Sequence, residues 1–244
     1  MTRRRVALVT GGAKGIGKAI VEKLASVGFS VAVNYNTSEK AAFELVAKLQ
    51  SQGVNALAVK ADVSDYNAVK RMYDECRSYF GFVDTLVNNA GISLIKPLYE
   101  CTENDFDRVI DVDLKSVFNT CRIFTPDMTS ESFGRIVNVA SVWGEYGGST
   151  ETLYSAAKAG VIGFTKALNA ELAPGGVIVN AVSPGFIDTF MNAELSAADV
   201  NAFLESVSVG RVGSPEEVAE AVEFLTREKL YVAGANISVN GGIL

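Results

Sequence analysis

The sequence predicts an α/β fold, a doubly wound, seven-stranded parallel sheet with helices on both faces, within 244 residues. Short apolar runs alternate from end to end with stretches whose apolar residues recur at helical spacing. The apolar runs lack polar alternation, which is typical of parallel strands that are buried on both faces. A glycine-rich turn follows the first run directly, which is typical of the connection between the first strand and the first helix of a doubly wound sheet.

The expected elements follow one another in a regular order. Seven short runs read as strands: Val6–Val9, Val31–Val33, Ala56–Val59, Thr85–Val87, Arg135–Val139, Val177–Val182 and Asn236–Val239. The stretches between them have helical periodicity: Ala41–Leu49, Ala68–Phe80, Phe106–Phe118, Tyr154–Leu172 and Glu216–Leu225. The last helix has a clear N-terminal capping signal: Ser214 can act as the N-cap, Pro215 suits the first helical position, and Glu217 completes a capping box.

We expect one domain over residues 1–244, because no linker, repeat or low-complexity tract divides the chain. Residues 187–209 are less regular than the rest. They follow Pro184-Gly185 at the end of a predicted strand, where this architecture binds ligands, so we interpret them as a lid over the substrate. An ordinary pair of surface helices is the alternative.

Charge and hydropathy exclude several classes of protein. With 22 Lys and Arg against 28 Asp and Glu, the formal charge is −6, which argues against binding of nucleic acid or an anionic membrane. No apolar run approaches the roughly 18 residues of a membrane span. After the basic start, only Val6–Val9 are apolar, too few for a secretory signal, so we expect a cytoplasmic protein.

The absence of histidine narrows the chemistry. It removes histidine triads, imidazole bases and the commonest metal ligand. Cys76, Cys101 and Cys121 form no CxxC pair, so we expect buried thiols and no metal site. Acid–base work then falls to Tyr, Lys, Asp, Glu or Ser.

The turn after the first strand, Thr10–Gly17, reads TGGAKGIG. Glycines at 11, 15 and 17 let a backbone turn sharply and approach a pyrophosphate, while the helix start offers free N–H groups. A nucleoside-triphosphate loop would need Ser or Thr where Ala19 stands. A dinucleotide therefore fits better than a triphosphate or a turn without ligand.

The end of the second strand indicates which dinucleotide. NAD binders place an acid about 20 residues past the loop, whereas this chain has Asn34, Tyr35 and Asn36, with no acid before Glu39. Lys14 adds a positive charge that would accept the 2′-phosphate of NADP. We therefore expect NADP(H); the alternative is that Lys14 is only a solvated lysine.

A candidate catalytic set lies further on. Tyr154 and Lys158 are at i and i+4 on one predicted helix, and Ser141 follows a predicted strand. Lowering a tyrosine pKa from about 10 to about 7 requires about 4 kcal/mol of preferential stabilisation of the phenolate. The ammonium and a positively charged nicotinamide ring could supply it together. Such a pair taken alone is more often a surface feature.

Together these motifs resemble the short-chain dehydrogenase/reductase family across essentially the whole chain. The resemblance is carried by Thr10–Gly17, Asn88-Asn89-Ala90-Gly91, Ser141, Tyr154-Ser155-Ala156-Ala157-Lys158 and Pro184-Gly185. Within the family it is closest to the 3-oxoacyl-ACP reductase branch, through YSAAKAGVIGF at Tyr154–Phe164, VSPGFIDT at Val182–Thr189 and the ending Val239-Asn240-Gly241-Gly242.

The resemblance implies a Rossmann-like fold and a role for each matching residue. Tyr154 would give a proton to the carbonyl oxygen, Ser141 would orient that carbonyl, and Lys158 would bind the nicotinamide ribose. The hydride would come from the cofactor. The cofactor-binding residues are Gly11, Lys14, Gly15, Ile16 and Gly17 at the phosphates, Asn34, Tyr35, Asn36, Asp62 and Val63 at the adenosine, Asn89, Ala90 and Gly91 at the ribose, and Pro184, Gly185, Ile187 and Thr189 at the carboxamide.

One residue departs from the family pattern. Where relatives usually have an asparagine that feeds a proton relay, this chain has Asp113. A carboxylate is nearly isosteric, but its charge would offset the field of Lys158 and let the pKa of Tyr154 rise. We expect a working enzyme with an altered pH profile; an inert surface acid is the alternative.

The segment between Ser141 and Tyr154 forms a substrate wall in this family. Trp143 and Tyr146 offer flat apolar surface, and Glu151, with Glu145, would disfavour an anionic group beside them. A carrier-bound acyl chain would keep its phosphopantetheine phosphate at the entrance of the pocket. These two carboxylates therefore do not exclude a carrier-bound substrate.

The combined prediction is an NADPH-dependent ketone reductase acting on a 3-oxoacyl thioester of a carrier protein or CoA. A sugar or polyol dehydrogenase and an inactive cofactor-binding protein are the alternatives. The resemblance also implies a homotetramer, or else a homodimer, and makes an acyl carrier protein a candidate partner. No nucleic acid, membrane or metal is expected.

Overall fold

The computed structural model describes residues 5–189, 200 and 204–243. Within them, a seven-stranded sheet with the order β3-β2-β1-β4-β5-β6-β7 is parallel throughout. The strands are β1 (Val6–Val9), β2 (Ser30–Tyr35), β3 (Ala56–Lys60), β4 (Thr85–Asn88), β5 (Gly134–Val139), β6 (Val177–Pro184) and β7 (Asn236–Val239). The predicted fold class is confirmed.

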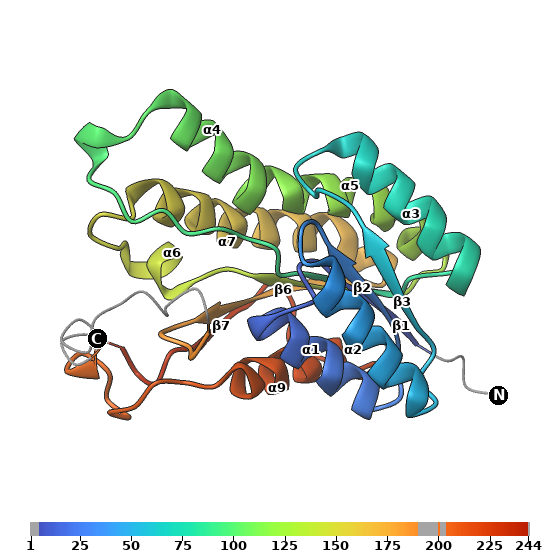
Figure 1. Ribbon diagram of the computed structural model, residues 1–244. Helices are drawn as coiled ribbons and strands as arrows, with labels where there is room; N and C mark the ends of the chain where they lie inside the picture. Colours follow the sequence, from blue (N-terminus) through green and yellow to red (C-terminus); the bar gives the residue numbers. More distant parts are fainter. Residues whose placement is uncertain (1–4, 190–199, 201–203, 244) are drawn as a thin grey trace.

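Helices cover both faces of this sheet (Figure 1). One face carries α1 (Gly15–Ser26), α2 (Glu39–Ser51) and α9 (Pro215–Thr226). The other carries α3 (Tyr66–Phe80), α4 (Glu103–Ile110), α5 (Ser116–Ser130) and α7 (Thr152–Leu172). In the described residues, no helix has the length and apolar character required to cross a membrane.

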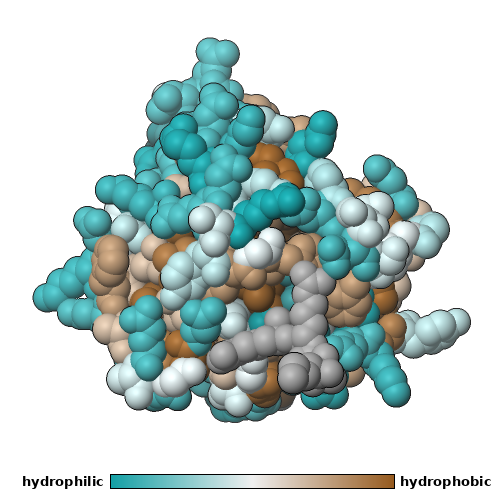
Figure 2. All heavy atoms as spheres, turned by 90° about the vertical axis from the view of Figure 1, so that its right-hand side faces the viewer, coloured by the Kyte–Doolittle hydropathy of each residue, from teal (hydrophilic) through white to brown (hydrophobic). Residues whose placement is uncertain are grey.

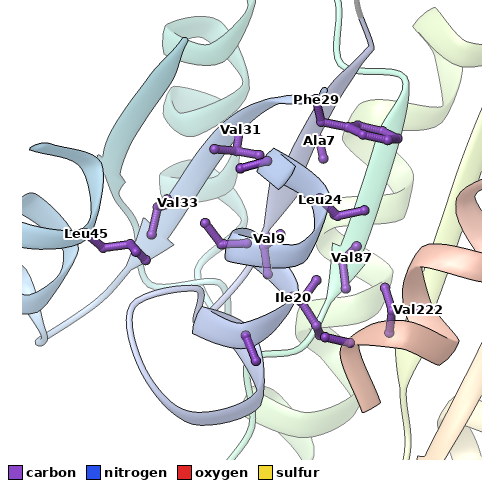
Figure 3. Close-up of a cluster of buried hydrophobic side chains, with 14 of the residues drawn as sticks. Ala7, Val9, Ile20, Leu24, Phe29, Val31, Val33, Leu45, Val87 and Val222 are labelled. Carbon is purple, nitrogen blue, oxygen red and sulfur yellow. The ribbon is translucent and has the colours of Figure 1, made fainter. Parts of the chain in front are cut away.

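Each face of the sheet has its own apolar core, because successive side chains of a strand point to opposite sides. Ala7 and Val9 of β1 pack with residues of α1, α2 and α9, whereas Leu8 packs on the opposite face with α3, α5 and α7. Figure 3 shows the first cluster, with Ile20 and Leu24 of α1 lying over β1. Burying each large side chain contributes about 1.5–3 kcal/mol. Figure 2 shows hydrophilic residues over the upper part and the edges of one face, with hydrophobic residues showing between them.

The strand order fixes where a ligand can enter. The chain proceeds from β1 outward to β3 and then returns to β4 on the other side of β1. The connections after β1 and β4 therefore diverge, and they leave a crevice at the carboxyl ends of the two strands, where doubly wound sheets bind ligands.

Two elements differ from expectation. The helix predicted over Phe106–Phe118 is α4 and α5 joined by a π-helical turn, Asp111–Lys115. The segment after Ser141, for which no helix was predicted, begins with a short helix, α6 (Val142–Tyr146). Of the predicted lid, residues 190–199 and 201–203 lie outside the described residues, so the lid stays a prediction.

Candidate active site

A single cavity of about 1050 Å³ occupies the crevice at the carboxyl ends of the strands. Its walls come from the connections after β1, β2, β3, β4, β5 and β6. Every residue predicted to bind the cofactor lines it, from the glycine loop to Thr189, and so do Ser141, Trp143 and Glu151. Motifs spread over nearly 180 residues of sequence thus face one space, because parallel strands end at the same edge.

The glycine loop has a backbone that only glycines allow. Gly11 and Gly15 have φ of +60° and +50°, a region that L side chains rarely adopt. A Cβ on Gly17 would collide with the Gly11 carbonyl and lie 2.6 Å from Nδ2 of Asn89. The loop therefore lies close against β4 and opens the N-terminal N–H groups of α1 to the cavity, as a pyrophosphate requires. Ala19 is buried and offers no hydroxyl, which removes the triphosphate alternative.

Asn89 and Thr10 hold that loop in place. The Asn89 amide donates to the carbonyls of Thr10 (3.0 Å) and Gly11 (3.3 Å). The Thr10 hydroxyl accepts from the N–H groups of Asn89 (2.9 Å) and Ala90 (3.0 Å). These bonds fix the end of β4 to the end of β1, so the Asn89 side chain supports the loop while its backbone borders the cavity.

The end of the cavity formed by the connections after β2 and β3, where we expect the adenosine, carries amides and hydroxyls. Asn34 is buried and accepts from the Gly11 N–H at 3.2 Å, while Asn36, Thr37 and Ser38 line the cavity beyond it. Asp62 lines the same end. Burial raises its pKa, but hydrogen bonds from Ser64 and Asn36 outweigh burial, and the pKa is lowered.

Ser141 lies between β5 and α6, and its hydroxyl oxygen already accepts a hydrogen bond. As the N-cap of α6, its Oγ accepts from the Trp143 N–H at 3.2 Å. A serine hydroxyl carries one proton and two lone pairs. The proton is therefore left to donate, and Ser141 faces the cavity.

Tyr154 and Lys158 occupy successive turns of α7. The Lys158 ammonium lies 5.5 Å from the centre of the Tyr154 ring. Lys158 is 4% exposed and donates to the Val139 carbonyl at 3.2 Å. Because Val139 ends β5, this bond holds the ammonium at the floor of the cavity, beneath the tyrosine.

Asp113 forms a buried ion pair with that ammonium. Its Oδ1 lies 3.3 Å from Nζ of Lys158, and its side chain is fully buried. The Ile92 N–H donates to both carboxylate oxygens, at 3.2 and 3.4 Å. Gly91 makes room for the pair, since a Cβ there would lie 2.5 Å from Oδ1. Asp113 is therefore not a surface acid, and its effect on the pH profile stays a prediction.

This ion pair changes the electrostatics expected of the tyrosine. Burial raises the pKa of Tyr154; the Lys158 ammonium and a hydrogen bond with Ser141 lower it, and Asp113 and Glu151 raise it again. The net direction is upward, whereas the sequence alone suggested a pKa lowered by Lys158. Burial also raises the pKa of Asp113. For Lys158, burial acts downward, but the adjacent carboxylate outweighs it and the pKa is raised.

The wall between Ser141 and Tyr154 contains two of the predicted substrate residues. Trp143 and Glu151 line the cavity, whereas Tyr146 is 62% exposed and is absent from the described lining, which corrects the expectation for it. Glu145 also turns away, since its carboxylate accepts from Asn236 (2.8 Å) and Ser238 (2.8 Å) of β7. The short helix α6, unexpected from the sequence, sets these directions.

At the opposite side, the end of β6 supplies the remaining wall. Gly185 is required there because a Cβ would lie 2.8 Å from the Cα of Asn240. Ile187 is buried, and its backbone bridges to Gly213. Sequence reasoning missed one wall, the polar face of α4 with Asn104, Asp107, Arg108 and the adjoining Asp111. No local signal distinguishes that face from an ordinary solvated one. Across the described part of the chain, no cluster of three His, Cys, Asp or Glu residues could hold a metal ion.

Comparison with known proteins agrees with this geometry. The profile of the short chain dehydrogenase family matches residues 5–200. The chain belongs to the short-chain dehydrogenase family. It is accordingly an oxidoreductase that uses a nicotinamide cofactor, which confirms the predicted family and enzyme class.

Several members of the family are similar over their full length. The 3-oxoacyl-[acyl-carrier-protein] reductase FabG of Staphylococcus aureus is 42% identical over 244 residues, covering 100% of this chain and 99% of the relative. A solved structure provisionally described as a gluconate dehydrogenase of Agrobacterium tumefaciens has a TM-score of 0.94 at 34% identity, covering 98% and 95% of the two chains. A blue fluorescent protein from a metagenomic library, solved with NADPH, has a TM-score of 0.92 at 36% identity, covering 98% and 97%.

Proposed function

We propose that this short-chain dehydrogenase reduces a 3-oxoacyl thioester, bound to an acyl carrier protein or CoA, to the 3-hydroxyacyl product with NADPH. The convergence of Ser141, Tyr154 and Lys158 on one cavity is the observation that carries the proposal. The full-length similarity to a 3-oxoacyl-[acyl-carrier-protein] reductase supports the substrate class.

The reduction needs two donors at the ketone oxygen. The Ser141 hydroxyl, whose oxygen already accepts from Trp143, donates to the carbonyl and fixes its orientation. Tyr154 transfers its proton to the same oxygen as that oxygen gains charge. NADPH, when bound in the cavity, would supply the hydride that the carbonyl carbon gains. Lys158, held by Val139 and Asp113, offers its remaining N–H to the nicotinamide ribose and its charge to the phenol.

The pKa of Tyr154 governs how the rate of reduction depends on pH. Reduction needs the neutral phenol, whereas oxidation of an alcohol needs the phenolate. Because burial, together with Asp113 and Glu151, raises the pKa of Tyr154, the phenol stays protonated to higher pH. The rate of reduction should therefore persist to higher pH than it would without these effects.

The preference for NADPH rests on charge at the adenosine end. Lys14, Asn36, Thr37 and Ser38 line that end, and the connection after β2 carries no acid before Glu39. A 2′-phosphate placed there meets donors, whereas the one carboxylate described at this end, Asp62, belongs to the connection after β3. A structural relative that was solved with NADPH supports this choice.

The test is a substrate panel followed by the loss of NADPH absorbance, repeated with NADH. It contains acetoacetyl-CoA, a longer 3-oxoacyl-CoA, a 3-oxoacyl carrier protein, a quinone and neutral sugars. The proposal expects turnover of the 3-oxoacyl thioesters with NADPH, and much less with NADH. Turnover confined to the sugars would overturn it in favour of the second candidate, a sugar or polyol dehydrogenase, which the similarity to a gluconate dehydrogenase favours.

We also propose a homotetramer, or a homodimer, built on the surface of α4 and α5. Phe106 of α4 and Phe118 of α5 are 47% and 48% exposed, so both helices offer apolar surface that a second copy could cover. Light scattering across a range of concentrations should give a mass of two or four chains; a monomer at micromolar concentration would contradict this.

A further inference from the structure

We propose that Glu151 sets the substrate specificity of this site by rejecting a carboxylate attached near the ketone, so that neutral 3-oxoacyl esters and thioesters are accepted and free 3-oxo acids are excluded. The inference rests on the proposed reduction of 3-oxoacyl groups. It assigns to Glu151 the selection between neutral and carboxylate-bearing ketones.

The first argument is the position of Glu151 along α7. Glu151 is the N-cap of α7, three residues before Tyr154, and its charge acts on the Tyr154 phenol. Lys158 lies one helical turn beyond Tyr154. All three line the cavity. Lys158 is held at the end of β5, whereas Glu151 stands at the start of α7, on the amino-terminal side of Tyr154; we infer that the rest of the substrate extends to that side.

The second argument is that helix structure does not require this side chain. Glu151 is the N-cap of α7, yet its side chain makes no capping hydrogen bond to the helix. The carboxyl group is half-buried among Trp143, Thr150 and Tyr154 in the cavity wall. A carboxylate at a helix N-terminus is favoured by the helix dipole, which helps to keep it charged.

The third argument is electrostatic. Burial raises the pKa of Glu151 and a hydrogen bond with the Trp143 side chain lowers it, and no cation of the described residues is among the causes of this shift. The Glu151 charge reaches the reaction centre, because it raises the pKa of the Tyr154 phenol. The cations of the cavity lining lie elsewhere: Lys158 is paired with Asp113, Lys14 is in the glycine loop and Arg108 is on α4.

A ligand at this position meets one negative charge with reduced access to water. In a free 3-oxo acid, the carboxylate is two bonds from the ketone carbon, so placing the ketone at Tyr154 brings that carboxylate toward Glu151. Two negative charges a few bond lengths apart repel more strongly in a partly desolvated site than in water. In an ester or thioester the same position is neutral, and it avoids this cost.

The test compares acetoacetate with methyl acetoacetate, a pair that differs in one charge near the ketone. The measured quantity is the ratio of kcat/KM for the ester to that for the acid, with NADPH saturating. In Glu151→Gln, which keeps the side-chain length and an acceptor for Trp143, the ratio should fall about tenfold, equivalent to about 1.4 kcal/mol. Binding of NADPH, followed by its fluorescence, checks that the variant is folded. Glu151→Ser, a good N-cap residue, serves if the Gln variant does not fold.

Glu145→Gln is the matched control. It removes one negative charge from the same segment, but its carboxylate faces β7 and not the cavity. The ratio should stay within about twofold of the parent value, since an exposed charge is screened. A ratio that is unchanged in Glu151→Gln and Glu151→Ser, or that falls equally in Glu145→Gln, would overturn the inference.

The design separates this inference from the proposed function. If the parent enzyme reduces no 3-oxoacyl ester or thioester but oxidises a sugar, the proposed function fails. The same variants are then compared on a neutral sugar and its sugar acid, where relief of acid exclusion in Glu151→Gln supports the role of Glu151 and unchanged exclusion overturns it.

Discussion

The two ends of the central sheet both bury charged side chains, but they do so in different ways. At the amino ends of the strands, Arg5 donates to Asp84 at 2.7 Å and to the Thr226 carbonyl at 2.8 Å. Nearby, Arg135 donates to the carbonyls of Arg227 (3.0 Å) and Glu228 (2.7 Å). At the carboxyl ends, Lys158 and Asp113 form a comparable pair beside the cavity.

The two ends differ in whether a buried cation keeps an unused hydrogen-bond donor next to space for a ligand. The Arg5 and Arg135 guanidiniums also lie over the Phe133 ring, so protein groups surround them. The Lys158 ammonium can donate three hydrogen bonds; Val139 and Asp113 account for two, and the ammonium also borders the cavity. A buried charge therefore indicates chemistry only where a donor remains and space for a ligand adjoins it.

The largest expected effect is on turnover at the carboxyl end. Tyr154→Phe removes the proton donor and keeps the ring beside Lys158, so kcat for the preferred ketone should fall about 10²–10⁴-fold. Binding of NADPH, measured by fluorescence titration, should persist. Turnover within a few-fold of the parent would remove Tyr154 from the mechanism.

The next effect is on stability at the amino end. Asp84→Ala strands the Arg5 charge and the Val6 N–H, which the carboxylate accepts at 2.8 Å. Breaking such a buried pair should lower the free energy of unfolding by about 3–5 kcal/mol, measured by urea denaturation. The kcat of the remaining folded protein should match the parent. A large loss of kcat without loss of stability would contradict the distinction between the two ends.

The smallest effect sharpens the role of the charge next to Lys158. Asp113 raises the pKa of Tyr154, so Asp113→Asn should lower that pKa. Reduction is lost as pH rises through the pKa of Tyr154; the alkaline limb of the kcat/KM profile should therefore move to lower pH. Asp127→Asn is the control. It removes a carboxylate of α5 that pairs with Arg77 of α3, so the alkaline limb should stay in place. Superimposable limbs for the parent and Asp113→Asn would contradict the electrostatic role.

Strands were the most predictable part of the fold. The limits of β1 agree with the prediction, because VALV is apolar on both faces and polar residues flank it. For β6 the prediction ends at Val182, but the strand continues to Pro184, which pairs with Val239 of β7. Such an extension depends on a partner distant in sequence, and local composition does not contain it.

Helix interruptions were less predictable. The apolar spacing over Phe106–Phe118 fits an unbroken helix, and nothing in it marks the π turn at Asp111–Lys115. At five residues, α6 is too short to show a periodicity. That omission explains the wrong expectation for Tyr146, whose direction follows from α6 rather than from a loop.

The residues of the candidate site were more predictable than its electrostatics. Motifs locate Ser141, Tyr154 and Lys158, and the cavity brings them together. The upward direction of the Tyr154 pKa depends on how deeply the phenol is buried and on the approach of Asp113. Both are properties of packing, which residue types alone do not determine.

The π turn between α4 and α5 makes this part of the active site sensitive to chain length. The Ser116 N–H bonds back five residues to the Asp111 carbonyl, so the turn holds one more residue than an α turn. Deleting one residue would allow a continuous helix, but it would rotate one half by about 100° relative to the other. The carboxylate would then swing away from its ammonium. Indels here should be selected against even where point changes are tolerated.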